Sequence, residues 1–459
     1  MKASTVRIAE SIFSRVLEDI KPSDKELEES VYNINELTSR LNKVISNDVE
    51  IRVVGSIVKG TQLVGDSDVD MFLLFDKKHS REKITADGIS YAKSIVKGKD
   101  ERYEIKYAEH PYVRVYLDSL GVKADIVPAF KIDNIEDMGT AVDRSPMHAD
   151  FINTHFSDKQ RDDVRVLKYL LKAQGIYGAE VMTSGFSGYL CELLVYQCGS
   201  LLKLLEMASE IKPPILLDPR NKVAMRDPSL VKRFNSEFVV IDPIDKNRNV
   251  AAGVSVEALA RFVVAAREFV RRPSIKLFYG KGFDSRKAKK LLDKFLEDSG
   301  LDLLMISISI PDKSEDIVWP QLRKVSELVT NHAERLGFGI YLTIPMIQDA
   351  RGLIAFFAPK ERIKSRILKG PSVFIGKAQR EFSEAHKNAI GMLMKGEVMY
   401  ALEKSEYEKL ADLMKDIVTG NIVKRHKDIK LHGGRLYLNR VPKEYLEQLY
   451  SELVRRTSL

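Results

Sequence analysis

Hydrophobic positions in the first 45 residues recur at the three- and four-residue spacing of helices. From Val49 the period shortens to that of strands, in runs separated by turns: VEIRVV, VDMFLLF, PYVRVYL and VKADIVPAF. A helix-like stretch near ITADGISYAKSIV lies between the second and third runs. Residues 1–145 are therefore predicted to form a mixed α/β domain with a small sheet.

Helical periodicity returns at about residue 158. Apolar residues of DKQRDDVRVLKYLLKAQG share one face, and Gly175 suits its C-terminal stop. The next segment, SGYLCELLVYQCGSLLKLLEMASEI, is apolar nearly all round and predicts one buried helix. Ser255 can cap a third helix, VEALARFVVAAREFVRR, which Pro273 ends. Residues 146–274 are predicted to be a helical second domain.

Strands and helices mix again after residue 275. The strands are MISISIP, GIYLTIP and GLIAFFAP, and the helices are KAKKLLDKFLEDSG and WPQLRKVSELVTNHAERLG. We assign 275–376 to an α/β body of the kind that often binds RNA backbone. Within the remainder, 377–459, residues 377–420 are predicted to be helical and KRHKDIKLHGGRLYLNR a basic strand hairpin. The expected fold class is α+β and multidomain, with a mostly helical tail.

Charge and cysteine content narrow the class of protein. The 459 residues carry 73 Lys and Arg against 65 Asp and Glu, a net charge of +8, which favours polyanions such as nucleic acid. Two cysteines, Cys191 and Cys198, cannot form a disulfide framework and fit a reducing, cytoplasmic location. The N-terminus does not resemble a signal peptide, and no apolar run predicts a membrane span.

Two carboxylates stand in VVGSIVKGTQLVGDSDVDMFLLF, beside an apolar strand. Side chains alternate along a strand, so Asp68 and Asp70 project from the same face. They repel each other unless a cation lies between them, and hard oxygen ligands suit Mg²⁺. Asp125 stands in a second strand, VKADIVPAF. Three strand aspartates at one edge are the ligand set of a two-metal phosphoryl-transfer site, so all three are predicted to be catalytic.

The loop before these aspartates has the composition of a phosphate-binding turn. Gly55 and Ser56 let backbone N–H groups approach a phosphate, and Ser56 adds a hydroxyl. Lys59 supplies a point charge for phosphate oxygens. A tight turn with surface aspartates would explain the Gly-Ser pair alone. The whole combination of loop and three strand aspartates favours an enzyme.

At these residues the chain resembles the polymerase-β-like nucleotidyltransferase superfamily. Further motifs narrow the resemblance to the class I, archaeal-type CCA-adding enzymes, which are tRNA nucleotidyltransferases: RSPMH, VRVLKYLLKAQGIYGAE, GFSGYLCELLVYQ and DPIDKNRNVAA. The resemblance implies template-independent addition of C, C and A to the 3′ end of tRNA. It also implies Mg²⁺ as cofactor and CTP, ATP and tRNA as partners, with body and tail holding the acceptor stem and elbow.

The family's nucleotide-binding residues carry over, by motif, onto Ser56, Lys59, His148, Lys168 and Tyr177. Each of the last three has a simpler alternative: His148 could neighbour a helix N-cap, Lys168 could be solvated, and Tyr177 could fill the core. Lys59 stands where members of the family often carry Arg, so a bidentate grip becomes a point contact. Asp68 stands where some members have Glu, which would also ligate metal.

Arg248, in DPIDKNRNVAA, is the candidate reader of the base. Cytosine and adenine share an edge with an amine donor beside a ring-nitrogen acceptor, whereas uracil and guanine present a carbonyl and an N–H. Because an Arg only donates, it could bond the first pair and not the second. The resemblance implies this role, and the alternative is a salt bridge to Asp242 or Asp245.

Two other functions remain open at this point. One is another nucleotidyltransferase, such as a poly(A)-adding enzyme or one that modifies a small molecule; the latter would not need so large a basic body and tail. The other is a non-catalytic RNA-binding protein with a decayed site, against which the three intact aspartates argue. The sequence also leaves open whether the chain forms a homodimer.

Overall fold

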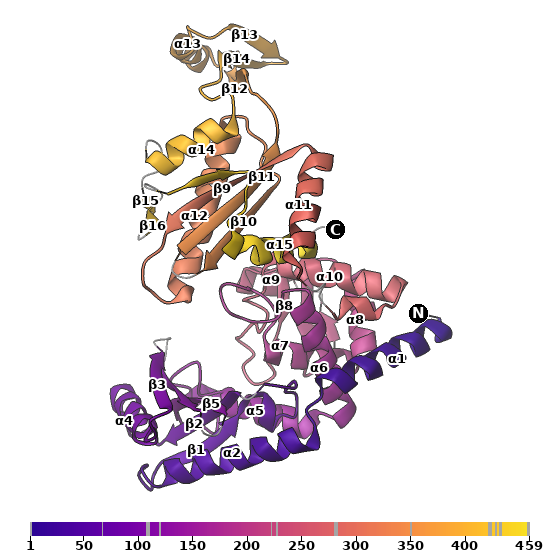
Figure 1. Ribbon diagram of the computed structural model, residues 1–459, viewed down its shortest axis with the longest axis vertical. Coiled ribbons are helices and arrows are strands. Elements are labelled where there is room, and N and C mark those ends of the chain that lie inside the picture. The colour runs from indigo at the N-terminus through magenta and orange to yellow at the C-terminus, as the bar shows by residue number, and fades with distance from the viewer. Residues whose placement is uncertain are drawn as a thin grey trace. The chain divides into compact units, whose positions relative to one another are not determined.

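The protein divides into two compact units, Met1–Gly280 and Lys281–Leu459 (Figure 1). The computed structural model describes residues 2–66, 68–106, 111–118, 121–221, 223–225, 228–279, 283–348, 351–420, 425–426, 429–430 and 434–456. Within them, no helix has both the length and the apolar character needed to cross a membrane. The finer division of the chain into four parts stays a prediction.

A mixed sheet forms the first part of the chain. Its strand order is β1-β2-β5-β4-β3, with β2 and β5 parallel and the other neighbours antiparallel. The strands are β1 (Glu50–Val54), β2 (Asp68–Phe75), β3 (Glu101–Lys106), β4 (Tyr112–Leu117) and β5 (Val122–Phe130). The four predicted strands are confirmed. Sequence analysis missed β3, whose run ERYEIK is largely exposed and lacks an apolar alternation.

Helices cover both faces of this sheet: α2 (Asp24–Asn42), α4 (Arg81–Ser94) and α5 (Ser145–His155). Alternation along β2 sends Val69, Met71 and Leu73 into a core shared with α2 and α4. Phe72 and Leu74 face the other way and pack beside α5. Asp70 has the same parity as Phe72, so the aspartates project on the α5 side of the sheet.

The predicted helical layer follows in the same unit. It contains α6 (Asp158–Ala173), α7 (Gly188–Cys198), α8 (Leu201–Glu210) and α10 (Val256–Arg271), and α1 (Ala3–Ile20) packs into its core. A small sheet of β6 (Ile215–Asp218), β7 (Val223–Met225) and β8 (Phe238–Val240) accompanies them.

Two details of the helical prediction have different outcomes. Ser255 caps α10 by accepting a hydrogen bond from the Ala258 N–H, as expected. The single long apolar helix is wrong, because Gly199 adopts φ +81° and ends α7, after which Ser200 caps α8. A left-handed glycine followed by a capping serine is a strong break signal that the continuous apolar pattern concealed.

The second unit centres on β9 (Leu301–Ser309), β10 (Leu342–Gln348) and β11 (Arg351–Pro359), all predicted strands. The predicted helices are also present, as α11 (Ser285–Ser299) and α12 (Glu315–Arg335). The chain then returns to this sheet at its end. There β17 (Leu436–Leu438) pairs with β9, and α15 (Leu446–Arg456) joins α11 in one core.

The prediction of helix throughout 377–420 is wrong in its middle. Between α13 (Gly376–Ala385) and α14 (Leu410–Thr419) the chain forms the hairpin β13 (Gly391–Lys395) and β14 (Val398–Lys404), which turns at Gly396 with φ +60°. β14 also pairs with β12 (Ser365–Ser372). Of the predicted basic hairpin, 424, 427–428 and 431–433 lie outside the described residues, and β15 (Arg425–His426) and β16 (Ile429–Lys430) are antiparallel as expected.

Candidate active site

The predicted aspartates lie on adjacent strands. Asp70 on β2 and Asp125 on β5 are direct partners in the parallel register, and Asp68 lies opposite Lys123. Burial, followed by the nearby carboxylates of Asp125 and Asp68, raises the pKa of Asp70 to about 6. A divalent cation bound at this position would relieve the repulsion between the buried Asp70 carboxylate and the two neighbouring carboxylates.

Two basic residues pair with the neighbouring aspartates. Arg114 on β4 donates from Nε and Nη2 to the Asp125 oxygens at 2.6 and 2.7 Å, and Lys123 Nζ contacts Asp68 Oδ2 at 2.7 Å. Among the described side chains, no three acids, histidines or cysteines converge as a ready-made metal cluster. The carboxylate oxygens are nevertheless suitable ligands for Mg²⁺, and a cation would offset the repulsion between them at Asp70. Sequence analysis missed Arg114 and Lys123, because only strand register brings them to the aspartates.

The phosphate-loop candidate opens a one-turn helix, α3 (Gly55–Val58), directly after β1. Gly55 has φ +85°, and a Cβ there would lie 2.2 Å from Asp70 Oδ2. Only glycine combines this backbone conformation with so close an approach to the carboxylate. The Ser56 carbonyl accepts from the Thr61 N–H at 2.9 Å and closes the loop.

Gly55→Ala is expected to lower kcat/KM for the nucleotide addition that the resemblance implies by at least about tenfold, because the new Cβ must displace the Asp70 carboxylate. Gly65→Ala is the matched control. Gly65 lies in the same connection with φ +75°, and nothing lies within 4 Å of an added Cβ. Both variants should lose about 1–2 kcal/mol of stability through left-handed strain. Equal kinetics for the two variants would contradict the close packing of loop and carboxylate.

A cavity of about 400 Å³ lies between the sheet, α5 and α7. Five of its lining residues are Gly55, Lys59, Asp70, Asp125 and His148. The structure therefore brings together two predicted aspartates and three predicted nucleotide-binding residues. The other five predicted site residues do not line it: Ser56, Asp68, Lys168, Tyr177 and Arg248.

Lys168 lies behind the loop and is only 2% exposed, so the solvated alternative is wrong. Its Nζ donates to the Thr61 carbonyl at 2.8 Å, and burial lowers its pKa although Glu192 opposes the shift. Tyr177 packs against the helical core, as its simpler alternative expected, and burial raises its pKa. Its hydroxyl lies beside Gly188, where an added Cβ would be 3.3 Å away.

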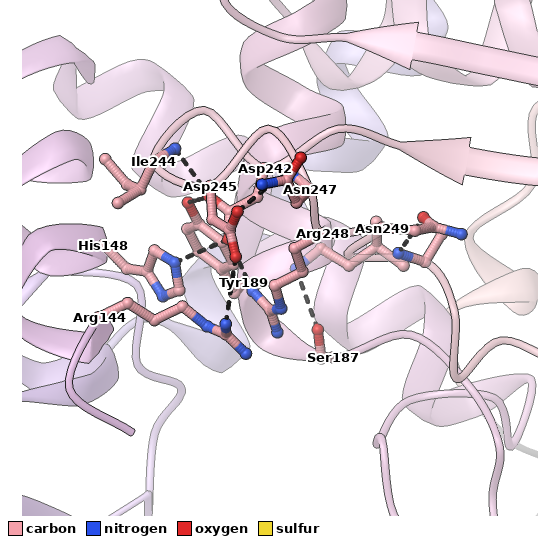
Figure 2. A network of polar contacts seen from close by, with 12 residues as sticks. Arg144, His148, Ser187, Tyr189, Asp242, Ile244, Asp245, Asn247, Arg248 and Asn249 are labelled. Carbon is pink, nitrogen blue, oxygen red and sulfur yellow. Dashed lines mark hydrogen bonds and ion pairs between the residues drawn. The ribbon is translucent and has the colours of Figure 1, made fainter. Parts of the chain in front are cut away.

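Asp242 gathers four donors in one buried network, shown in Figure 2. Its oxygens accept from His148 Nε2 at 2.9 Å, Arg248 Nη1 at 2.9 Å, the Tyr189 hydroxyl at 3.2 Å and the Ile244 N–H at 2.9 Å. Burial alone would raise the pKa of Asp242, but these hydrogen bonds hold it below its usual range.

The network fixes two candidate nucleotide contacts through one carboxylate. The His148 ring stacks on Tyr189 with centroids 4.0 Å apart, and burial lowers the pKa of His148. Arg248 forms the salt bridge that sequence analysis offered as its alternative role, yet its side chain stays 31% exposed. Sequence analysis did not assign Asp242 or Tyr189 to the site; Asp242 lies 94 residues from His148, and no local pattern connects them.

Three family models match successive parts of the chain: a nucleotidyltransferase domain at 32–152, the second domain of tRNA nucleotidyltransferase at 162–279, and the C-terminal domain of CCA-adding enzyme at 299–430. The CCA-adding enzyme of Pyrococcus abyssi is 36% identical over 96% of this chain and 97% of its own. That of Methanocaldococcus jannaschii is 34% identical over 90% and 91%. The chain belongs to the CCA-adding enzyme family. The resemblance drawn from its motifs is confirmed.

Among solved structures, one of the Cid1 poly(U) polymerase, described as Mg 3′-dATP bound, is similar to part of this CCA-adding family member. It aligns with a TM-score of 0.48 and 17% identity over 59% of this chain and 98% of that one. The family models, rather than this alignment, establish a nucleotidyltransferase domain at the start of the chain.

Proposed function

We propose that the chain adds C, C and A to the 3′ end of tRNA from CTP and ATP without a nucleic-acid template. The observation that carries the proposal is the pairing of Asp70 with Asp125 on parallel strands, beside the Gly55 loop, in a chain that matches CCA-adding enzymes along nearly its whole length. Carboxylates beside a close-approaching glycine suit binding of a metal-bound triphosphate.

Asp68, Asp70 and Asp125 would hold Mg²⁺, which when bound would stabilise the charge that develops on the phosphoryl oxygens. The tRNA 3′-hydroxyl attacks the α-phosphate in line, the P–O bond to the β-phosphate breaks, and pyrophosphate leaves. Asp125 would complete the metal site that serves the hydroxyl and help to remove its proton. Gly55, Ser56, Lys59 and Lys168 bind the triphosphate.

Selection of the base falls to Arg248 in this proposal. One guanidinium nitrogen, Nη1, is engaged by Asp242, and the partial exposure of the side chain supports a second edge that can donate to a base. A donor-only edge matches cytosine and adenine. His148 and Tyr177 would contact the ribose and phosphates.

The decisive experiment supplies tRNA lacking its 3′ end with each labelled NTP in turn. We expect CTP to be incorporated first and ATP once, after two cytidines. Continuous addition of A would identify a poly(A)-adding enzyme, and incorporation of no nucleotide, despite RNA binding, would identify a non-catalytic RNA-binding protein. Modification of a small molecule predicts no dependence on tRNA.

The second unit is proposed to hold tRNA. Its module of residues 365–404 has seven basic against four acidic residues and exposes Ile367, Phe374 and Met394. A surface that is both basic and apolar supports contact with RNA backbone and unstacked bases, as expected at the tRNA elbow. The proposal includes a cytoplasmic location, and the mass of the protein in solution will decide whether it forms a homodimer.

Removing this module is expected to weaken tRNA binding by roughly tenfold or more while leaving NTP affinity unchanged. Simple truncation after residue 377 would also remove Leu449 and Leu453, which belong to the core of the body. Excision of 365–404 avoids this loss, because the Ser405 N–H donates to the Lys364 carbonyl at 3.0 Å and a short glycine link can join the ends. Calorimetric loss of NTP binding in a folded excision variant would contradict this division of labour.

A further inference from the structure

A carboxylate with no role in the mechanism above lies directly beneath the phosphate loop. Glu192, on α7, is completely buried. Its Oε2 accepts from Lys59 Nζ at 2.6 Å and its Oε1 from the Thr61 hydroxyl at 2.8 Å. Lys168 Nζ reaches the same Thr61, with 2.8 Å to its carbonyl and 3.2 Å to its hydroxyl. We call these four residues the lysine cluster.

The lysine cluster contains two ammonium groups and one carboxylate. Neither lysine is solvated: Lys59 is 9% exposed and Lys168 is 2% exposed. A buried ammonium without a counter-charge tends to lose its proton, and a neutral amine contacts phosphate far more weakly than an ammonium does. Glu192 is therefore the group that compensates the charge of the two buried ammonium groups before a nucleotide binds and adds its own negative charge.

We propose that Glu192 is a positioning residue for the triphosphate, which holds the Lys59 ammonium in place and keeps Lys168 protonated before the nucleotide binds. This inference rests on the proposed role of the two lysines in binding the triphosphate. Lys59 lies between the cavity and the buried lysine cluster, since it lines the cavity beside Asp70 and also contacts Glu192. A bound triphosphate can then share Lys59 with Glu192.

Other ionisable groups surround the lysine cluster, and among the causes of the shifted pKa of Lys168, Glu192 is the largest that opposes burial. Arg161 and Arg165 face the loop from α6 and donate to the carbonyls of Lys59 and Gln62. The other ionisable neighbours include Asp66 beside Lys168 and Asp70, whose charge interacts with that of Lys59. They also include Tyr177, Tyr189 and Cys191, whose pKa values burial raises, so that these three stay neutral near pH 7.

The test compares the Kd of CTP and ATP for Glu192→Gln and unmodified protein by calorimetry, without metal, from about pH 7 to about pH 9. Gln keeps the shape of the side chain and removes its charge. We expect a variant-to-wild-type Kd ratio of about ten at the upper pH, where Lys168 without its counter-charge loses its proton, falling to about one or below at the lower pH. This range lies above the pKa of Asp70, about 6, which cancels in the ratio in any case.

Asp163→Asn is the matched control, because Asp163 is a buried acid of the same helical layer that accepts from the Leu201 N–H far from the loop. It should leave the Kd of CTP and ATP near that of unmodified protein at every pH. If Glu192→Gln does not fold, Thr61→Val removes the hydroxyl that joins Glu192 to Lys168 and should give a smaller ratio with the same rise at high pH. A ratio that is near one throughout, or raised but independent of pH, overturns the inference. Nucleotide transfer to trimmed tRNA by unmodified protein, measured in parallel, tests the proposed function separately.

Discussion

Asp70→Asn is expected to abolish nucleotide addition while tRNA binding stays intact. Asp70 lies at the centre of the three aspartates, in register with Asp125 and against Gly55. Losing a metal ligand there removes charge stabilisation of the transition state on the order of several kcal/mol, or at least about a thousandfold in rate. Single-turnover addition to trimmed tRNA, together with filter binding of the same tRNA, measures both quantities.

The stability of this variant separates loss of the site from loss of the fold. The folded pKa of Asp70, about 6, exceeds the ordinary value of 3.8, so its ionised form destabilises the fold. That penalty is absent at low pH and grows as the pH rises through about 4 to 6. Asn cannot ionise, so the melting temperature of Asp70→Asn in EDTA at neutral pH should be equal to or higher than that of unmodified protein.

Asp76→Asn serves as the control for Asp70→Asn. Asp76 is exposed at the far end of β2, where it accepts from the Lys78 N–H, and its substitution should leave addition unchanged. Near-normal turnover by Asp70→Asn would show that the metal assignment is wrong. Lost activity with a lowered melting temperature would instead indicate a structural role.

Arg248→Ala is expected to cut incorporation of CTP and ATP by about tenfold or more, since a bidentate donor contributes ~1–3 kcal/mol of base discrimination. Incorporation of UTP and GTP, which this edge does not bond, should fall little. The preference for CTP and ATP over UTP and GTP should therefore decrease. Arg248→Lys should rescue poorly, because one ammonium cannot reproduce a planar fork that bonds Asp242 and a base together. The test measures incorporation of all four nucleotides by each variant, together with the melting temperature of that variant.

The pairing of Arg248 with buried Asp242 makes a structural effect the main competing explanation. Arg220→Ala is an appropriate comparison, because Arg220 is also an arginine beside a largely buried aspartate, Asp218, in the same helical layer. It should cost similar stability without altering the choice of nucleotide. If Arg248→Ala behaves in the same way, with all four nucleotides falling together and a lower melting point, the base-reading role is lost.

Local chemistry allowed the strands of the candidate site, and the side on which two of its aspartates project, to be predicted. Period-two alternation put Asp68 and Asp70 on one face, and the cap at Ser255 was correct. The missing parts depend on pairings distant in sequence. Glu192 meets Lys59 across 133 positions, and its helix otherwise looks like a wholly apolar segment. A single charge in such a segment is a useful signal, because burying it requires a partner.

The errors in the fold also have local physical causes. The continuous apolar character of α7 and α8 outweighed one glycine, Gly199, whose left-handed conformation divides them. In 391–404 the helix-favouring Met, Leu, Lys and Glu residues form a hairpin around Gly396, since pairing with β12 supplies hydrogen bonds that propensity cannot anticipate.

The placement of α1 constrains how the cavity can open. Its residues Ala9, Val16 and Ile20 belong to the core of the helical layer, although α2, which follows at once, packs on the β-sheet. The sheet region is thus joined to the helices through residues 21–23 and through α5, and the loop before β2 adds a third anchor, because its Leu63 belongs to the same helical core. A sheet held at three points cannot swing freely against the helices, so we expect the space between β2 and α7 to change little in width.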